Sequence, residues 1–247
     1  MREFSFDYDQ VPPGYYDRIA RQGTGLQRAW HVHKFEFLID TLGHHFGQDP
    51  MHVLDLGCGP GTLLGMLRDR LTITGVGVDI ASGQLEYAQR TYGSDALRFL
   101  AASFEAEEVQ DEMSRADAIT LVEVVEHLPL DYVYRTLSTI HARMKKGAML
   151  VITTPNYLSI WPVLERAISV LGELNYEEQH ILHFNRIKLV NLLATVGFDD
   201  IQVQSFMQFS PFVAGVLGSS VGRLARRIEQ RTLRHAGPLL CARTVKI

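Results

Sequence analysis

Carboxylates and histidines that could perform acid–base or metal chemistry gather in two stretches of the chain. The first contains Glu123, Glu126 and His127, and the second contains His180 and His183. Histidine is the natural general base for a hydroxyl or an amine near neutral pH, so all three histidines are candidate catalytic residues. The first stretch has the spacing i, i+3, i+4, which places its side chains on one face of a helical turn. With His180 added, it is also an alternative set of metal ligands.

A third stretch, 53–61, combines an apolar run, an acid and glycines at alternate positions. This pattern predicts a buried strand that turns tightly into a helix, because glycine tolerates positive φ and lets the backbone approach a ligand. About twenty residues further on, a second apolar run ends in an acid that can accept hydrogen bonds from ribose hydroxyls. The predicted cofactor-binding residues in these two stretches are Asp55, Gly57, Gly59, Gly61, Asp79 and Ile80.

The loop reads G-x-G-x-G, which differs from the G-x-G-x-x-G of dinucleotide-binding proteins. Residues 50–155 resemble the class I S-adenosylmethionine-dependent methyltransferases. The resemblance implies S-adenosylmethionine as cofactor, S-adenosylhomocysteine as product, and a carboxylate at Asp55 that favours a cationic ligand. It further implies in-line transfer of the methyl group, in which the protein holds the reacting atoms collinear and deprotonates the acceptor.

The same resemblance assigns further residues around the cofactor. Ser103 stands where the family usually places an acid that contacts the adenine, and Phe104 can cover the adenine ring. Glu123 borders the cofactor, and Tyr16 belongs to an N-terminal lid that lies over it.

Apolar runs alternate with helical patterns along the chain, which predicts a doubly wound, Rossmann-like α/β fold with a mostly parallel sheet. Five strands are expected near 51–56, 74–79, 97–101, 116–122 and 147–154, with helices near 62–70, 82–92, 104–112 and 130–144. Two more strands, near 200–206 and 238–246, would complete a seven-stranded sheet whose last strand is antiparallel, as in this family.

The rest of the chain is expected to add helices to this core. Residues 1–50 form an N-terminal helical lid and residues 51–247 the methyltransferase domain, with helical insertions near 156–180 and 211–235. The second insertion carries an apolar stripe and a ridge of arginines with Glu229 opposing it. The stripe is Val213, Leu217, Val221, Leu224 and Ile228, and the ridge is Arg223, Arg227, Arg231 and Arg234, with Arg226 nearby.

Three functions fit these residues. Glu123, Glu126, His127 and His180 match the Mg²⁺ ligands of small-RNA 3′-terminal 2′-O-methyltransferases. The same E-x-x-E-H sequence also resembles metal-free ubiquinone-pathway O-methyltransferases and their sugar- and lipid-modifying relatives. We predict the metal-free reading, with a hydroxyl, or alternatively an amine, as acceptor. Mg²⁺ prefers oxygen ligands, and two imidazoles would make an unusual site for it. The third reading is a non-catalytic protein that binds S-adenosylmethionine.

The composition of the chain indicates which classes of partner and which compartment to expect. With 46% hydrophobic and 21% charged residues and a net charge of −4, the chain resembles an ordinary soluble protein and lacks the basic surface expected of a nucleic-acid binder. Only two cysteines are present and the N-terminus lacks a signal-peptide pattern, so a cytoplasmic enzyme is predicted. Arginines in 211–235 could attract an anionic acceptor or touch the inner membrane peripherally, or form a solvated face. The oligomeric state is left open.

Overall fold

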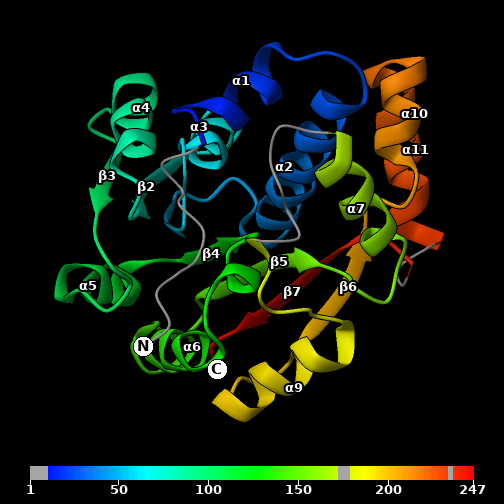
Figure 1. Ribbon diagram of the computed structural model, residues 1–247. Coiled ribbons are helices and arrows are strands. Elements are labelled where there is room, and N and C mark those ends of the chain that lie inside the picture. Colours follow the sequence, from blue (N-terminus) through cyan, green and yellow to red (C-terminus); the bar gives the residue numbers. More distant parts are fainter. Residues whose placement is uncertain (1–10, 172–178, 233–235) are drawn as a thin grey trace.

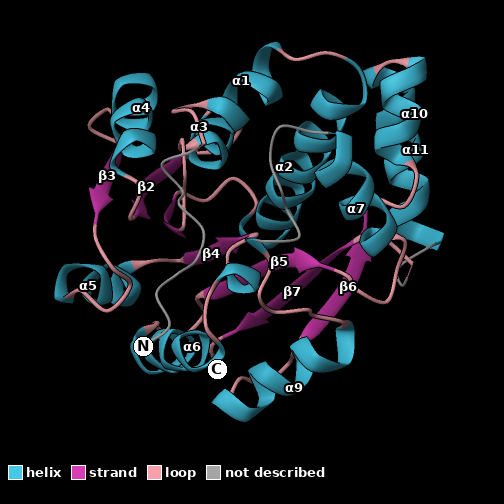
Figure 2. Ribbon diagram, viewed as in Figure 1, coloured by secondary structure: helices cyan, strands magenta, loops and turns pink. Residues whose placement is uncertain are grey.

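A seven-stranded sheet with helices on both faces forms the centre of the computed structural model, which describes residues 11–171, 179–232 and 236–247 (Figures 1 and 2). The strands are β1 (Met51–Leu56), β2 (Ile73–Asp79), β3 (Leu97–Ala101), β4 (Ala118–Val122), β5 (Met149–Pro155), β6 (Gln202–Phe206) and β7 (Leu239–Val245). Their order is β3-β2-β1-β4-β5-β7-β6, and β7 runs antiparallel to both of its neighbours. The predicted fold, including the antiparallel last strand, is confirmed.

Alternate side chains of each strand enter two separate hydrophobic cores. Leu54 of β1 packs with α5 (Glu107–Arg115), α6 (Leu130–Arg143) and α9 (Arg186–Val196), and its neighbour Val53 packs with α2 (Gly25–Phe46) and α3 (Thr62–Arg68). This period of two is the geometry of a strand that is buried on both faces. Figure 1 shows α5, α6 and α9 on one side of the sheet, and α3 and α4 (Ser82–Tyr92) on the other.

The N-terminal helix α1 (Tyr15–Gln22) is tied to α4 by a buried carboxylate. Asp17, which is 2% exposed, accepts hydrogen bonds from the hydroxyls of Tyr87 at 2.8 Å and Tyr92 at 2.5 Å. The backbone N–H of Gly14 donates to Gln84 of α4 at 3.0 Å. These contacts hold α1 against α4, so this part of the sequence-predicted lid is a docked element of the fold.

The insertions differ in detail from the expectation. The single helix expected at 211–235 is two helices, α10 (Ser210–Leu217) and α11 (Ser219–Thr232), because Gly218 between them has φ +86°. The first insertion contains α7 (Trp161–Leu171), and its residues 172–178 lie outside the described ranges. The expected helix at 104–112 begins later, at Glu107, since the Ala106 N–H closes a turn onto the Ser103 carbonyl at 3.1 Å. Among the described residues, no helix has the length and apolarity needed to cross a bilayer.

Candidate active site

The glycine loop between β1 and α3 is as tight as its sequence indicates. Gly57 and Gly61 have φ of +76° and +74°. A Cβ on Gly57 would lie 2.5 Å from Val124, and one on Gly61 would lie 2.7 Å from Phe99. A Cβ on Gly59 would meet nothing within 4 Å, so the middle of the loop borders open space where a ligand can approach the backbone. The contact with Val124 also places this loop against the turn that follows β4.

Asp79 holds the loop from the end of β2. Its carboxylate accepts the backbone N–H of Gly59 at 2.8 Å and that of Ala81 at 2.9 Å. Next to it, Ile80 is 66% exposed, an unusual position for a large apolar side chain and one that suits packing against an adenine ring. Both residues lie at the carboxyl edge of the sheet, where open α/β folds bind their ligands.

Asp55 lies beneath the loop instead of facing it. The side chain is 2% exposed, and its Oδ1 accepts a hydrogen bond from the Thr120 hydroxyl at 2.6 Å. Burial raises the pKa of Asp55 to about 7, with the Asp79 charge acting in the same direction and the Thr120 bond opposing it. A carboxyl group with this pKa is only partly ionised at neutral pH, so the attraction of Asp55 for a cationic ligand stays a prediction.

The predicted adenine contacts divide between surface and core. Ser103 is exposed, and its Oγ accepts the Glu105 N–H at 3.0 Å. Phe104 is 8% exposed and packs in the core with its ring 6.2 Å from that of Tyr132, so its expected place over the adenine is not supported. An aromatic residue after a short strand can either cover an adenine ring or pack in the core, and only the packing of the folded chain distinguishes the two. Tyr16 is half-buried in α1, with its ring 5.5 Å from that of His31 in α2.

Glu123 has left-handed backbone, with φ +56°, which is unusual for a residue with a side chain and is often found at functional sites. One carboxylate oxygen lies 3.2 Å from Nζ of Lys34 in α2, and the other accepts the Thr153 hydroxyl at 3.2 Å. Glu123 thus joins α2 to the end of the sheet, and it is not part of the cluster formed by Glu126 and the histidines. Lys34 was absent from the predicted residues, although a lysine close to Phe35, Phe37 and Leu38 in the predicted helix was a signal for it.

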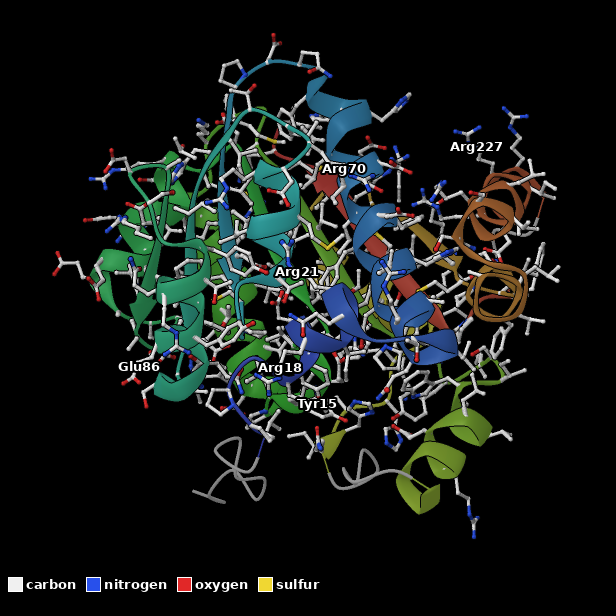
Figure 3. The ribbon with its side chains drawn as sticks, turned by 90° about the horizontal axis from the view of Figure 1, so that it is seen from above. Tyr15, Arg18, Arg21, Arg70, Glu86 and Arg227 are labelled. Atoms are coloured by element: carbon white, nitrogen blue, oxygen red, sulfur yellow. The ribbon has the colours of Figure 1, made fainter. Side chains whose placement is uncertain are left out.

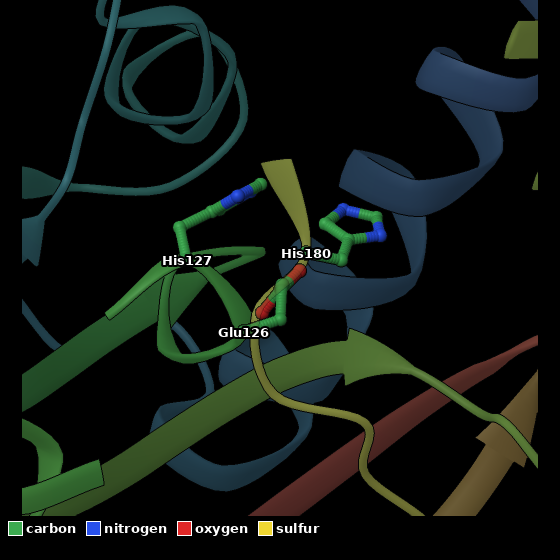
Figure 4. A group of neighbouring side chains, drawn as sticks. All are labelled: Glu126, His127 and His180. Atoms are coloured by element: carbon green, nitrogen blue, oxygen red, sulfur yellow. The ribbon is translucent and has the colours of Figure 1, made fainter. Parts of the chain in front are cut away.

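Glu126, His127 and His180 come together beyond the end of β4, each with one potential ligand atom within 4.8 Å of the others (Figure 4). The short helix Val125–His127 presents the first two residues. His127 Nδ1 lies 2.9 Å from the Gln179 carbonyl, which can only accept, so Nδ1 carries the proton and Nε2 has the lone pair. Burial lowers the pKa of His127 to about 4, and charge on His180 adds to this, so the imidazole is neutral at pH 7.

Glu126 is fully buried, and among the described residues neither carboxylate oxygen has a partner with normal hydrogen-bond geometry, although the nearby Thr154 hydroxyl acts to lower its pKa. Burial raises its pKa well above the ordinary range, and the nearby Glu123 charge raises it further. A buried carboxylate in this condition needs either a proton or a cation. One carboxylate oxygen and two imidazole nitrogens can hold a divalent cation, so these three residues fit a metal, whereas the four-residue set with Glu123 does not assemble.

His180 is oriented by residues of the first insertion that the sequence did not single out. Its Nδ1 hydrogen-bonds to Glu165 of α7, and the Tyr157 hydroxyl donates to the same carboxylate at 2.8 Å. Burial opposes ionisation of Glu165, but the bonds from His180 and Tyr157 outweigh it and lower the pKa of Glu165. A carboxylate that holds one imidazole nitrogen directs the other towards a substrate, as in hydrolytic triads. Glu165 and His180 are 15 residues apart in the sequence, so no local sequence pattern predicts that they pair.

His183 does not join this cluster. It is exposed, and its ring stacks on that of Tyr157 with centroids 4.1 Å apart. Of the three predicted bases, His180 is buried and His127 is half-buried in the cluster beyond β4, whereas His183 lies outside it.

The sheet order, the glycine loop and the acid at the end of β2 define a class I S-adenosylmethionine-dependent methyltransferase fold. The family model "Methyltransferase domain" matches residues 30–203, and the chain belongs to this family.

Comparisons with individual proteins agree on the class. Over 100 residues the chain is 36% identical to the ubiquinone biosynthesis O-methyltransferase of Azorhizobium caulinodans, covering 37% of this chain and 39% of that protein. Over 156 residues it is 27% identical to the enzyme of the same name from Brucella ovis, covering 58% and 62%. The chain thus spans less than two thirds of the length of these relatives.

Solved structures show the fold over nearly the whole chain. Magnesium protoporphyrin IX methyltransferase from Synechocystis, with bound S-adenosylhomocysteine, has a TM-score of 0.63 at 15% identity and covers 94% of this chain and 93% of its own. Geranyl diphosphate C-methyltransferase from Streptomyces coelicolor has a TM-score of 0.60 at 17% identity, covering 95% and 84%.

Proposed function

We propose that this protein transfers the methyl group of S-adenosylmethionine to a hydroxyl of a small-molecule, sugar or lipid-like acceptor. The observation that carries this proposal is His180, a buried imidazole held by Glu165 beside the turn that contacts the glycine loop. A sulfonium methyl is transferred without help from an acid, but a hydroxyl must lose a proton to attack it. A positioned imidazole supplies that step.

The proposed reaction needs one base for the acceptor proton, and the histidine–carboxylate pair supplies it. The acceptor oxygen forms a bond to the methyl carbon as the carbon–sulfur bond breaks, and S-adenosylhomocysteine leaves. The acceptor proton passes to His180, and the Glu165 carboxylate stabilises the imidazolium that forms. The neutral His127, with its lone pair on Nε2, can accept a hydrogen bond from the acceptor and orient it.

The relatives support oxygen as the atom that is methylated, since the matched curated proteins are named O-methyltransferases.

We place the enzyme in the cytoplasm, because Cys58 and Cys241 are both free and buried, as is usual in a reducing compartment.

A second candidate mechanism is favoured by the carboxylate–imidazole cluster. If Glu126, His127 and His180 hold a divalent cation, the cation would lower the pKa of a bound hydroxyl and make a separate base unnecessary. The two mechanisms share the cofactor and the fold and differ in their response to a chelator.

The test is production of S-adenosylhomocysteine from S-adenosylmethionine with a panel of hydroxylated aromatic, sugar and prenylated acceptors. Turnover with at least one hydroxyl acceptor, abolished when that hydroxyl is already methylated, would support the proposal. Binding of S-adenosylmethionine with no turnover on any acceptor would favour a non-catalytic binding protein instead.

A further inference from the structure

Helices α10 and α11 expose an unusual amount of hydrocarbon. Of the five residues predicted to form the apolar stripe, four are largely exposed, and Val216 is exposed beside them. The exposed fractions are 83% for Val216, 63% for Leu217, 42% for Val221, 58% for Leu224 and 49% for Ile228. These five residues are called the apolar face here. Single exposed apolar residues are ordinary, but a contiguous group on two adjoining helices marks an interaction site.

The charged residues of α11 explain why the apolar side faces outward. Arg226 is 8% exposed, with its Nη2 atom 3.3 Å from Glu36 and 3.1 Å from Asp40 of α2. Glu229 is 2% exposed and accepts both the backbone N–H and the hydroxyl of Ser210, at 2.5 and 2.7 Å. The expectation that Glu229 opposes an exposed arginine ridge is therefore wrong. The helix buries paired charges and turns leucine and isoleucine outward, the reverse of a helix on an ordinary soluble surface.

Exposed arginines flank the apolar face. Arg223, Arg227 and Arg231 project from α11, while Arg234 of the expected ridge lies outside the described residues. Beside Arg223, a cleft of about 360 Å³ between α1, α2, α3 and α11 is lined by three more arginines, Arg21, Arg28 and Arg70. Glu36 and Asp69 are the acidic residues of its lining, so the cleft carries a net positive charge. In Figure 3, Arg21 and Arg70 are labelled towards the middle of the view, and Arg227 projects from α11 at the periphery of the molecule.

We propose that the apolar face and its arginines dock on an anionic lipid bilayer. An interfacial helix binds by burying apolar side chains at the boundary between headgroups and acyl chains while basic residues contact anionic headgroups. The apolar face and Arg223, Arg227 and Arg231 supply both parts on the same helices. A second copy of this chain is a poorer partner, because a symmetric pairing would bring the same arginines face to face.

This surface is connected to the candidate active site by aromatic rings. The distance between ring centroids is 6.5 Å from Phe212 of α10 to Trp30. It is 5.8 Å from Trp30 to Trp161 and 6.1 Å from Trp161 to His180. These packed rings tie α10 to the candidate active site. The docking proposal does not depend on the proposed function.

The test is co-sedimentation with vesicles of phosphatidylcholine and phosphatidylglycerol in equal parts, compared with vesicles of phosphatidylcholine alone. Wild-type protein is expected to bind the anionic vesicles at least about tenfold more tightly, and about 0.5 M salt should remove most of that difference. Equal binding to both compositions, or to neither, would overturn the proposal.

Variants assign the binding to this face. Arg223→Gln with Arg227→Gln should reduce anionic-vesicle binding about tenfold or more, since each basic residue near such a surface contributes several-fold. Leu217→Ser, Leu224→Ser and Ile228→Ser together should abolish it on both vesicle types. The matched control is Ile187→Ser with Arg90→Gln, which removes a 67% exposed isoleucine and an exposed arginine elsewhere and should bind like wild type.

Folding and self-association are monitored in parallel. Thermal melting by circular dichroism checks each variant, and the arginine pair and the salt series decide the question even if the triple variant unfolds. Sedimentation velocity reports the alternative: a wild-type dimer that becomes a monomer in the triple variant, without binding to vesicles, would make the face a contact between copies and overturn the proposal.

Discussion

Lys34 in the middle of α2 and Glu123 at the end of β4 form an ion pair, with Nζ 3.2 Å from Oε2 and both side chains mostly buried. The pair connects the N-terminal helices to the sheet edge that carries the glycine loop and the histidines. The second carboxylate oxygen accepts the Thr153 hydroxyl, so the side chain of Glu123, whose backbone is left-handed, is held at both oxygens.

Breaking this pair should destabilise the protein. Lys34→Met leaves the Glu123 charge without its partner, and we expect the free energy of unfolding in urea to fall by about 3 kcal/mol. The double variant Lys34→Met with Glu123→Gln should recover at least half of that loss, because no unpaired charge remains. If the double variant is as unstable as the sum of the single ones, the two residues are not coupled.

Asp79→Ala should weaken binding of S-adenosylmethionine by roughly 1.5–3 kcal/mol, measured by isothermal titration calorimetry. The variant loses the expected hydrogen bonds to the ribose and also the bonds that hold Gly59 and Ala81. Asp95→Ala, an exposed carboxylate beyond α4, is the control and should bind normally. Unchanged affinity in the Asp79 variant would argue against the cofactor site.

Replacing His180 with alanine should lower turnover by roughly 10²–10⁴-fold while cofactor affinity is retained. Glu165→Gln should lower turnover less than His180→Ala does, since it removes the charge that stabilises the imidazolium formed during transfer. His183→Ala, on the exposed face of Tyr157, should stay within a few-fold of wild type. Equal loss in the two histidine variants would mean that the assignment of the base is wrong.

Glu126→Gln together with a chelator distinguishes the two mechanisms. Glutamine keeps the shape of the carboxylate but lacks the charge that a divalent cation requires. The metal-free mechanism predicts that turnover stays within about tenfold of wild type in the variant, and that a chelator has no effect on the wild-type enzyme. Loss of activity with chelator, restored by Mg²⁺ or Mn²⁺ in wild type but not in the variant, would establish the cation mechanism.

Asp55 should make the stability of the protein depend on pH near neutrality. Its pKa of about 7 in the folded state lies above the ordinary 3.8, so the folded protein binds this proton more tightly than the unfolded chain. The stabilisation is complete below pH 4 and is lost as pH rises through 7. Asp55→Asn resembles the protonated form at every pH. The melting temperature of the variant minus that of wild type should therefore be larger at pH 8 than at pH 5, by roughly 2–4 °C for each kcal/mol of stability that wild type loses over this range. An equal difference at both pH values, as expected for exposed Asp95→Asn, would contradict the raised pKa.

The sequence by itself determined the fold and the place of the cofactor. Strand and helix periods, the glycine loop and the acid that ends β2 are local patterns, and each depends on neighbours within a few residues. Parallel strands joined by helices bring their carboxyl ends to one edge, so the loop at Gly57 and the acid at Asp79 had to meet. This is why the predicted strands and the observed ones agree to within about two residues.

Only the tertiary structure decided which polar residues meet. Lys34 pairs with Glu123, and Glu165 pairs with His180, although each partner lies in a different segment of the chain. The hydrophobic pattern of a segment predicts which of its sides is buried but not which other segment will pack against that side. The same reason explains Phe104, which packing placed in the core. It also explains α11, whose two charged residues could turn inward only because Glu36, Asp40 and the start of α10 provide partners there. Burial of a charge is favourable when a partner is in place, and that partner is known only once the chain has folded.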